Sequence, residues 1–189
     1  MKLKSFLLLF VMLIASSQLS NSQSSGNAVI DQLLSAWSPR NFTTLPVTDQ
    51  QIDLILKCGI KAPSGRNLQP WHFTVVTGEA SMQEIIPDAV AGNVLFVISG
   101  KETATGGTPD FDCGLATENM FIAATSLGLG GRIYGSPVAA AIRNRDKLQI
   151  PAGFKPVIIL RAGNVEKSTD ASSGASPRKT VDEMVNYVK

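Results

Sequence analysis

Apolar residues along this chain follow two periodicities, and each predicts its own kind of element. Repeats at three- and four-residue spacing, as in Ile30, Leu33, Leu34 and Trp37, are typical of amphipathic helices. Continuous apolar runs and β-branched or aromatic runs instead indicate strands. The pattern predicts helices over residues 29–37, 48–60, 81–86, 110–127, 137–147 and 177–185, and strands over 71–77, 94–99 and 157–162.

Two of these helices carry recognisable end signals. Thr48 and Gln51 have the spacing of a capping box, which satisfies free backbone N–H groups at a helix start. Asp112 is in position to cap the helix over 110–127. That helix is apolar on almost every face and is predicted to lie in a core or a subunit interface. It stops at the segment 128–131 (Gly-Leu-Gly-Gly), where glycines allow positive φ and close backbone approach.

The first 22 residues are predicted to be a secretory signal peptide that is not part of the fold. Lys2 and Lys4 precede an apolar run over 6–14 that is too short to span a bilayer, and small polar residues follow. Cleavage before Gln23 and cleavage before Gln18 both fit, and an uncleaved membrane anchor is the alternative. Residues 23–189 would then form a single domain of about 165 residues in an exported, periplasmic protein.

Composition argues against several classes of function. The formal net charge is only +2 and no basic run has interleaved aromatic residues, so a nucleic-acid interface is not expected. His72 is the sole histidine and is predicted to be exposed on its strand, so neither a metal cluster nor a Ser-His-Asp triad is supported. Cys58 and Cys113 form either a disulfide or, in the interpretation favoured here, two buried free thiols.

The polar loop between the helix over 48–60 and the strand over 71–77 is the main candidate for binding chemistry. Pro63 and Pro70 stiffen it by fixing φ and removing backbone donors. Between them the loop offers Ser64, Gly65, Arg66, Asn67 and Gln69. Amide and guanidinium groups can read the edge of a flat heterocycle that has donors and acceptors side by side. The alternative is a tight turn whose polar side chains satisfy one another.

This loop, Ala62-Pro63-Ser64-Gly65-Arg66-Asn67-Leu68-Gln69-Pro70-Trp71-His72-Phe73, resembles the A-P-S-x-x-N-x-Q-P-W-x-F signature of the FMN-dependent nitroreductase family. Two further clusters resemble that family: Ser38, Arg40 and Phe42 fit R-R-S-x-R-x-F, and Asp112 begins a D-x-G that leads through the apolar helix to G-L-G. The resemblance spans about residues 38–185. It implies an α+β sandwich, a central, mostly antiparallel sheet flanked by helices, in a homodimer with FMN in a groove shared by both subunits.

The same resemblance implies roles for individual residues. Phosphate contacts would come from Ser38, Arg40, Arg178 and Lys179. Ring contacts would come from Asn67 at the pyrimidine edge, Arg66 near N1 and O2, the neighbouring Pro63, Ser64, Gly65 and Gln69, and backbone near Gly130, Tyr134 and Gly135. Ala36 and Trp37 stand where the family has arginines, so at least one cationic contact is missing. No catalytic acid or base is assigned.

The basic pair Arg178 and Lys179 opens a predicted helix, where the helix dipole favours acidic residues. A bound dianion would resolve that conflict.

The resemblance further implies an oxidoreductase that takes electrons from NAD(P)H or another donor and reduces nitroaromatic, quinone or similar acceptors. Two alternatives stay open. An exported FMN-binding electron carrier without NAD(P)H turnover would fit the signal peptide, because NAD(P)H is not expected outside the cytoplasm. A relative of the flavin-dependent reductive dehalogenases would need a substrate lid, for which residues 86–94 leave little chain.

Overall fold

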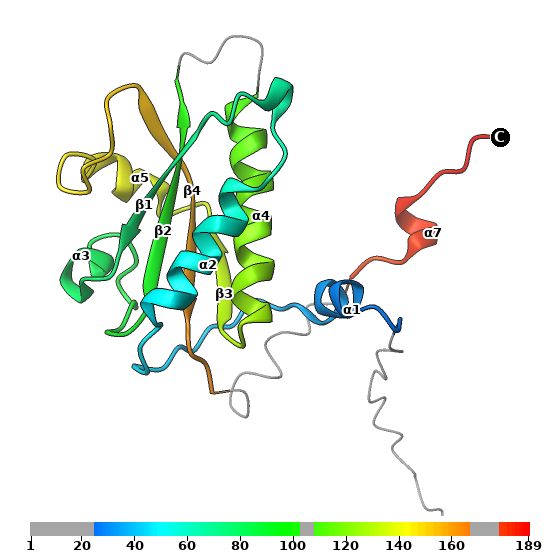
Figure 1. The fold of residues 1–189 in the computed structure, drawn as a ribbon, viewed down its shortest axis with the longest axis horizontal. Coiled ribbons are helices and arrows are strands. Elements are labelled where there is room, and N and C mark those ends of the chain that lie inside the picture. The colour runs from blue at the N-terminus through cyan, green and yellow to red at the C-terminus, as the bar shows by residue number, and fades with distance from the viewer. Residues whose placement is uncertain (1–24, 103–107, 167–177) are drawn as a thin grey trace, which may run out of the picture.

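The computed structural model describes residues 25–102, 108–166 and 178–189. The predicted signal peptide lies outside them. Within these ranges the elements follow one another along the chain as α1 (Ala28–Ser35), α2 (Asp49–Ile60), the 3-10 helix η1 (Gly65–Asn67), β1 (Trp71–Val76), α3 (Glu79–Gln83), β2 (Val94–Lys101), α4 (Pro109–Ser126), β3 (Gly130–Tyr134), α5 (Val138–Arg143), β4 (Phe154–Gly163) and α7 (Val181–Met184) (Figure 1).

The strands form one antiparallel sheet in the order β1-β2-β4-β3. The two central strands, β2 and β4, pair along nearly their whole length, with one irregularity between Ile98 and Ser99. All but the last residue of β2 are buried, as its continuous apolar run predicted. The predicted α+β class and antiparallel sheet are therefore confirmed. The order of the strands leaves β1 and β3 as the sheet edges.

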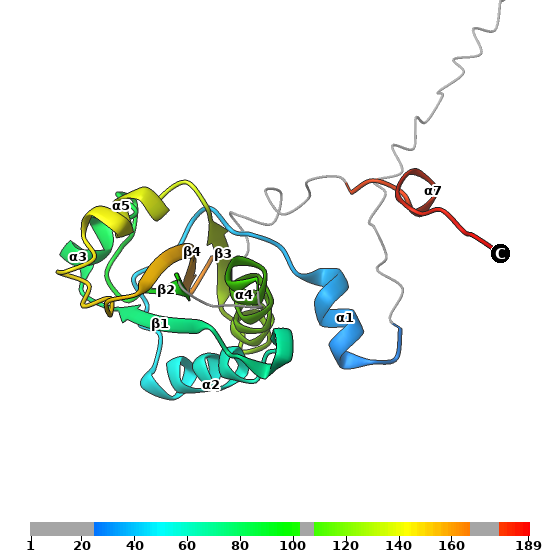
Figure 2. The same ribbon diagram turned by 90° about the horizontal axis from the view of Figure 1, so that it is seen from above.

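Helices cover both faces of the sheet (Figure 2). Alternate side chains of β2 divide between the two layers, because successive residues of a strand point to opposite faces. Phe96 packs in the cluster beneath α2 and α4, whereas Leu95 and Val97 pack in the cluster that also contains Met82 of α3 and Ala141 of α5. The sheet is therefore the middle layer of a three-layer sandwich.

Helix α4 is the core helix that its sequence predicted. Seven of its residues are buried, and Met120 has no exposed surface. The predicted cap is wrong: Asp112 lies inside the helix, and Thr108 precedes it without a side-chain cap. The capping box of α2 is confirmed, since Thr48 and Gln51 each accept a hydrogen bond from the other's backbone N–H.

Other sequence expectations need correction. Helix α5 ends at Arg143, well before the predicted residue 147. Arg145 beyond it is half-buried, and its guanidinium donates to the carbonyls of Pro151 and Phe154 instead of lying on a solvated helix face. His72 is likewise half-buried, against the Phe154 ring at 5.5 Å between ring centroids.

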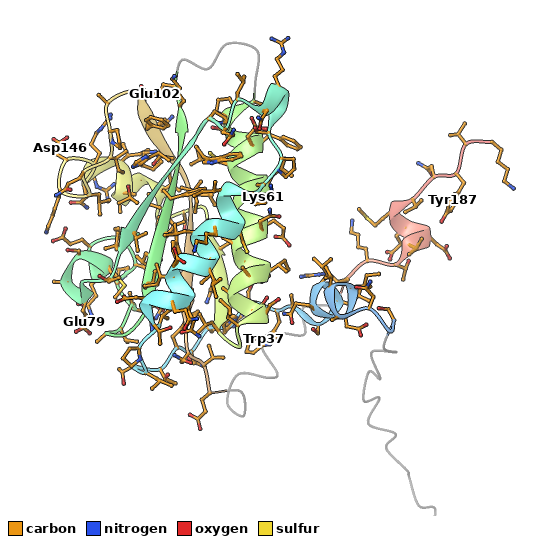
Figure 3. All side chains as sticks on the ribbon, viewed as in Figure 1. Trp37, Lys61, Glu79, Glu102, Asp146 and Tyr187 are labelled. Carbon is orange, nitrogen blue, oxygen red and sulfur yellow. The ribbon has the colours of Figure 1, made fainter. Side chains whose placement is uncertain are left out.

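Helix α7 stands apart from the sandwich, whereas α1 lies beside it and contacts the end of α4 (Figures 1 and 2). Neither has a buried residue. Apolar side chains on both are largely exposed: Val29, Ile30, Leu33 and Leu34 on α1, and Val181, Met184 and Tyr187 on or just after α7. Figure 3 shows Trp37 where the α1 segment joins the sandwich and Tyr187 on the distant C-terminal segment. These two segments leave an unusual amount of apolar surface open to solvent.

The two cysteines are both free thiols, so the interpretation favoured over a disulfide is confirmed. Their environments differ, because Cys58 is exposed and Cys113 is buried. The prediction that both would be buried is therefore wrong for Cys58.

Thiol reactivity should follow this difference. Burial, with smaller contributions from the charges of Asp110 and Asp112, raises the pKa of Cys113 to about 12. Only the thiolate reacts readily, so Cys113 should stay protonated and inert at pH 8. We expect a folded Cys58→Ser variant to show no reaction with a disulfide reagent at pH 8 and one reactive thiol after denaturation. Reaction of the folded variant would contradict the burial of Cys113.

Candidate functional site

The loop from Pro63 to Pro70 joins α2 to β1 and has an unusual backbone. Arg66, Asn67 and Gln69 all have positive φ, at 55°, 55° and 47°. Asn tolerates this region, but for Arg and Gln it costs about 1 kcal/mol or more each. Such strain persists only where surrounding contacts hold the chain in place, and it is concentrated at functional sites.

Several hydrogen bonds hold this strained backbone. The N–H of Gly65 donates to Oδ1 of Asp112 at 3.1 Å, and the N–H of Gln69 donates to Oγ of Ser64 at 3.0 Å. At the loop's end, the N–H of Lys101 donates to the carbonyl of Pro70 at 2.8 Å. Asp112 is 1% exposed, so the loop is anchored to a buried carboxylate of the core helix. The predicted rigidity of the loop has this physical basis.

The polar side chains of the loop point outward from this rigid base. Gly65, Arg66, Asn67 and Gln69 are exposed, and Ser64 is half-buried. The Gln69 amide donates to Oδ1 of Asn67 at 3.3 Å, which is the mutual satisfaction that the alternative interpretation predicted. The amide groups nevertheless remain at the surface, where a ligand can compete for them.

Two adjoining cavities open next to the start of α4. One has a volume of about 590 Å³ and is lined by Gly100, Lys101, Glu102, Thr108, Pro109, Asp110, Lys155 and Val157. The other, of about 390 Å³, shares Asp110, Lys155 and Val157 with it and also meets Gly135 and Ser136. Asp110 is two residues from Asp112, the anchor of the loop. The structure therefore brings the predicted site residue Gly135 to the same end of α4 as the loop.

Tyr134, beside Gly135, is a further candidate at this end of β3. Its hydroxyl is buried and has no hydrogen-bond partner within the described residues. Its ring lies 5.0 Å from the guanidinium carbon of Arg132. A buried hydroxyl without a partner is costly, and a ligand that bonded it would remove that cost.

Ser38 and Arg40 lie near the opposite end of β3. Both are exposed, while Pro39 between them is buried. A Cβ on Gly130 would lie 2.6 Å from Cγ of Pro39, so glycine is required there by close approach. Gly130 thus contributes packing, and the positive φ predicted for this turn occurs at Gly128, at 81°.

A third cavity, of about 250 Å³, lies at this end of β3. It is lined by Gln32, Ser35, Ala36, Trp37, Thr125, Gly128, Leu129, Gly130 and Val165. Ala36 and Trp37, which stand where the family has arginines, therefore face this space, and no cation is among these lining residues.

Arg178 and Lys179 are not brought to the other predicted site residues. Both are exposed and lie on the α7 segment, away from the sandwich (Figure 1). The predicted conflict with the helix dipole is also wrong, because α7 begins at Val181 with Thr180 as its cap and Asp182 and Glu183 in its first turn. The argument for a bound dianion at that helix start therefore falls away.

Three comparisons with known proteins bear on this geometry. Residues 33–95 match the Nitroreductase family model. The fold superposes on a nitroreductase with bound FMN from Desulfitobacterium hafniense with a TM-score of 0.72, at 21% identity over 86% of this chain and 99% of that one. The chain has the nitroreductase fold. A nitroreductase with bound FMN from Bacteroides fragilis superposes with a TM-score of 0.69, at 21% identity over 86% of this chain and all of that one (100%).

The sequence relatives match over a smaller part of each chain than the solved structures do. A provisionally named NADH dehydrogenase/NAD(P)H nitroreductase of Archaeoglobus fulgidus is 32% identical over 102 residues, which cover 49% of this chain and 59% of the relative. An NADPH-flavin oxidoreductase of Vibrio harveyi is 28% identical over 145 residues, which cover 66% of this chain and 60% of the relative. The chain therefore matches about three fifths of the length of these relatives.

Two features of this site were not predicted from the sequence. Asp112 anchors the loop, although its acidic character pointed to a helix cap. Lys155 lines both cavities at the start of α4, one of which is also lined by Gly135, and its position in β4 gave no signal of this. Both roles arise from contacts between segments that are distant along the chain.

Within the described residues, no group of three His, Cys, Asp or Glu side chains comes together as a metal site would require. Nor does any helix in that part of the chain have the length and apolar character needed to cross a bilayer.

Proposed function

We propose that this protein is an FMN-dependent oxidoreductase of nitroreductase type, which takes electrons from NAD(P)H or another donor and reduces nitroaromatic, quinone or similar acceptors. The observation that carries the proposal is the strained loop, where three non-glycine residues with positive φ are held in place next to exposed amides. The loop lies within the part of the chain that matches the Nitroreductase family. Relatives named for NAD(P)H or NADPH oxidoreductase activity support the reaction class.

The spacing of the candidate residues suits FMN. Gly130 and Tyr134 lie four residues apart on β3, which corresponds to about 13 Å. One FMN, with its phosphate, ribityl chain and ring, can cover that distance, with Ser38 and Arg40 at the phosphate end and Gly135 and the loop at the ring end. The residues present therefore fit this cofactor.

When bound, FMN would supply the electron-transfer chemistry, and the protein would bind and orient it. Arg40 would donate charge-assisted hydrogen bonds to the phosphate, which are stronger than neutral ones. Asn67 would meet the pyrimidine edge, since its amide is exposed on a fixed backbone. Arg66 would place positive charge where negative charge develops on reduction. The cavities beside Gly135 would admit an acceptor.

A homodimer is part of the proposal. The apolar side chains on α1 and near α7 are exposed in one chain, with Leu34 at 69% and Met184 at 63%. A second copy that covered them would remove this surface from water and stabilise the assembly. Arg178 and Lys179 would then approach a phosphate from a swapped segment. A monomer in light scattering at micromolar concentration would contradict this part of the account.

Export remains a proposal based on the apolar run over 6–14. If the protein is exported, an FMN-binding carrier without NAD(P)H turnover becomes the second candidate, because nicotinamide donors stay in the cytoplasm. N-terminal sequencing of protein from the periplasmic fraction should find Gln23 or Gln18 first. An intact Met1 in a cytoplasmic fraction would remove the reason for the carrier alternative.

The role of Asn67 is tested by two variants that separate side chain from backbone. Asn67→Gly removes the amide and suits the positive φ, whereas Asn67→Ala removes the amide and adds strain, because alanine tolerates positive φ less well than asparagine. If the amide binds FMN, both variants should bind it about fivefold more weakly, as expected for one neutral hydrogen bond of about 1 kcal/mol. Affinity is read from quenching of flavin fluorescence. Full affinity in Asn67→Gly would assign Asn67 a purely conformational role.

A further inference from the structure

Arg161 on β4 is the largest fully buried side chain described, at 1% exposure. All three nitrogen atoms of its guanidinium donate hydrogen bonds. Nε donates to Oδ1 of Asn93 at 2.8 Å, Nη1 to Oδ2 of Asp88 at 3.0 Å, and Nη2 to the carbonyl of Asp88 at 3.0 Å. Burying a cation costs free energy, and such a residue is tolerated where its donors are matched geometrically.

The ion pair alone does not account for this arrangement. The Asp88 side chain is 66% exposed, so water screens its charge and the attraction contributes little to stability. A buried apolar residue could fill the same volume without the cost of desolvation. What an arginine adds is a flat, directional group that fixes the groups around it.

The group that Arg161 fixes is the segment 38–43. Its guanidinium carbon lies 4.1 Å from the centre of the Phe42 ring, a close cation–π contact. Asn93, which accepts from Arg161, donates its own amide to the carbonyl of Thr43 at 3.0 Å. The N–H of Thr43 donates in turn to the carbonyl of Asn164 at 2.8 Å.

The packing around the neighbouring Gly163 leaves no space for a larger side chain. A Cβ on Gly163 would lie 2.8 Å from the Asn93 amide nitrogen and 2.9 Å from Cδ1 of Phe42. Segment 38–43 is thus held against the sheet at Phe42 and Thr43. Phe42 lies only two residues beyond Arg40.

We propose that Arg161 is a positioning residue that holds Ser38 and Arg40 where they bind the phosphate of FMN, through its stacking on Phe42 and its hydrogen bond to Asn93. The inference rests on the proposed function. It adds a residue that does not touch the cofactor and acts only through segment 38–43. It also offers an explanation of how a phosphate site works with Ala36 and Trp37 in place of cations. With fewer cationic contacts to the phosphate, each remaining one must be held more firmly in position.

The test compares FMN with riboflavin, which has the same ring and ribityl chain but no phosphate. Arg161→Met keeps an unbranched apolar side chain but removes the planar cation. We expect this variant to bind FMN about tenfold more weakly while its affinity for riboflavin stays unchanged, so the preference for FMN falls about tenfold. Arg161→Lys should behave in the same way, since it keeps the charge but cannot stack as a plane or reach Asn93 and Asp88 together.

A control variant and a second test variant keep the outcome decisive. Ile98→Val removes one methyl group from the buried core and lowers stability without changing segment 38–43, and it should leave the FMN preference unchanged. If Arg161→Met does not fold, Phe42→Leu removes the stacked ring and leaves all three hydrogen bonds of Arg161.

An unchanged preference for FMN in folded Arg161 and Phe42 variants would overturn the proposal, as would an equal loss of both flavins. Failure of the unaltered protein to bind FMN would instead overturn the proposed function itself.

Discussion

Replacing Arg178 with alanine should raise the dissociation constant of FMN by a factor of about 10 to 150, which corresponds to about 1.5–3 kcal/mol. A hydrogen bond from a guanidinium to a phosphate carries charge on both partners and is correspondingly strong. Arg178 is exposed and separate from the sandwich in the single chain, so its contribution requires the C-terminal segment to close on a phosphate. Fluorescence titration with FMN measures the effect.

The matched control for this variant is Lys189→Ala. It removes one exposed positive charge from the same C-terminal segment at a position with no predicted contact. Long-range attraction would weaken FMN binding equally in both variants and would depend on salt concentration. Equal affinities in Arg178→Ala and Lys189→Ala would show that no specific phosphate contact is made by Arg178.

The largest expected effect on folding is that of Met120→Ala. Met120 has no exposed surface and lies in the cluster between the sheet and helices α2 and α4. Removing a buried side chain of this size costs about 2–5 kcal/mol, because contacts are lost and a cavity remains. Chemical denaturation measures the free energy of unfolding. A loss below about 1 kcal/mol would contradict the tight packing described for this helix.

Gly59 of α2 provides an internal check, because the two residues share one space. A Cβ on Gly59 would lie 2.7 Å from Cγ of Met120, so Gly59→Ala alone should destabilise by about 1–3 kcal/mol through overpacking. In the Met120→Ala background the clash with Met120 is gone, the ring of Phe73, with Cζ at 3.3 Å, can shift into the space left by Met120, and the helix preference of alanine over glycine is worth about 1 kcal/mol. Gly59→Ala should therefore stabilise the Met120→Ala variant. Simple addition of the two losses would show that the residues do not meet.

The sequence predicted those elements whose signals are local. The capping box at Thr48 and Gln51 and the buried run of β2 depend on residues close together in the chain, and both are confirmed. The start of α7 also has a local signal, since Thr180 and Glu183 repeat the spacing of a capping box, but the predicted helix over 177–185 begins too early and includes the basic pair.

The rest depends on contacts that no local pattern contains. The strand order β1-β2-β4-β3 places β4 between two strands that precede it in the chain. The positive φ of Arg66 and Gln69 opposes the preference of both residue types and exists because Asp112, 47 residues away from Gly65, holds the loop. The sequence around Arg161 on β4 does not predict its hydrogen-bond partners, because Asn93 and Asp88 come close to it only in the folded sheet.

The most direct test of FMN-dependent oxidoreductase function is the visible absorption spectrum of the natively purified protein, recorded before and after addition of NADH under anaerobic conditions. The account predicts a bound-flavin spectrum that bleaches with NADH and returns when a quinone or nitroaromatic acceptor is added. A flavin spectrum that does not bleach with NADH or NADPH would favour the carrier alternative. A colourless protein that also fails to take up added FMN would contradict the central claim.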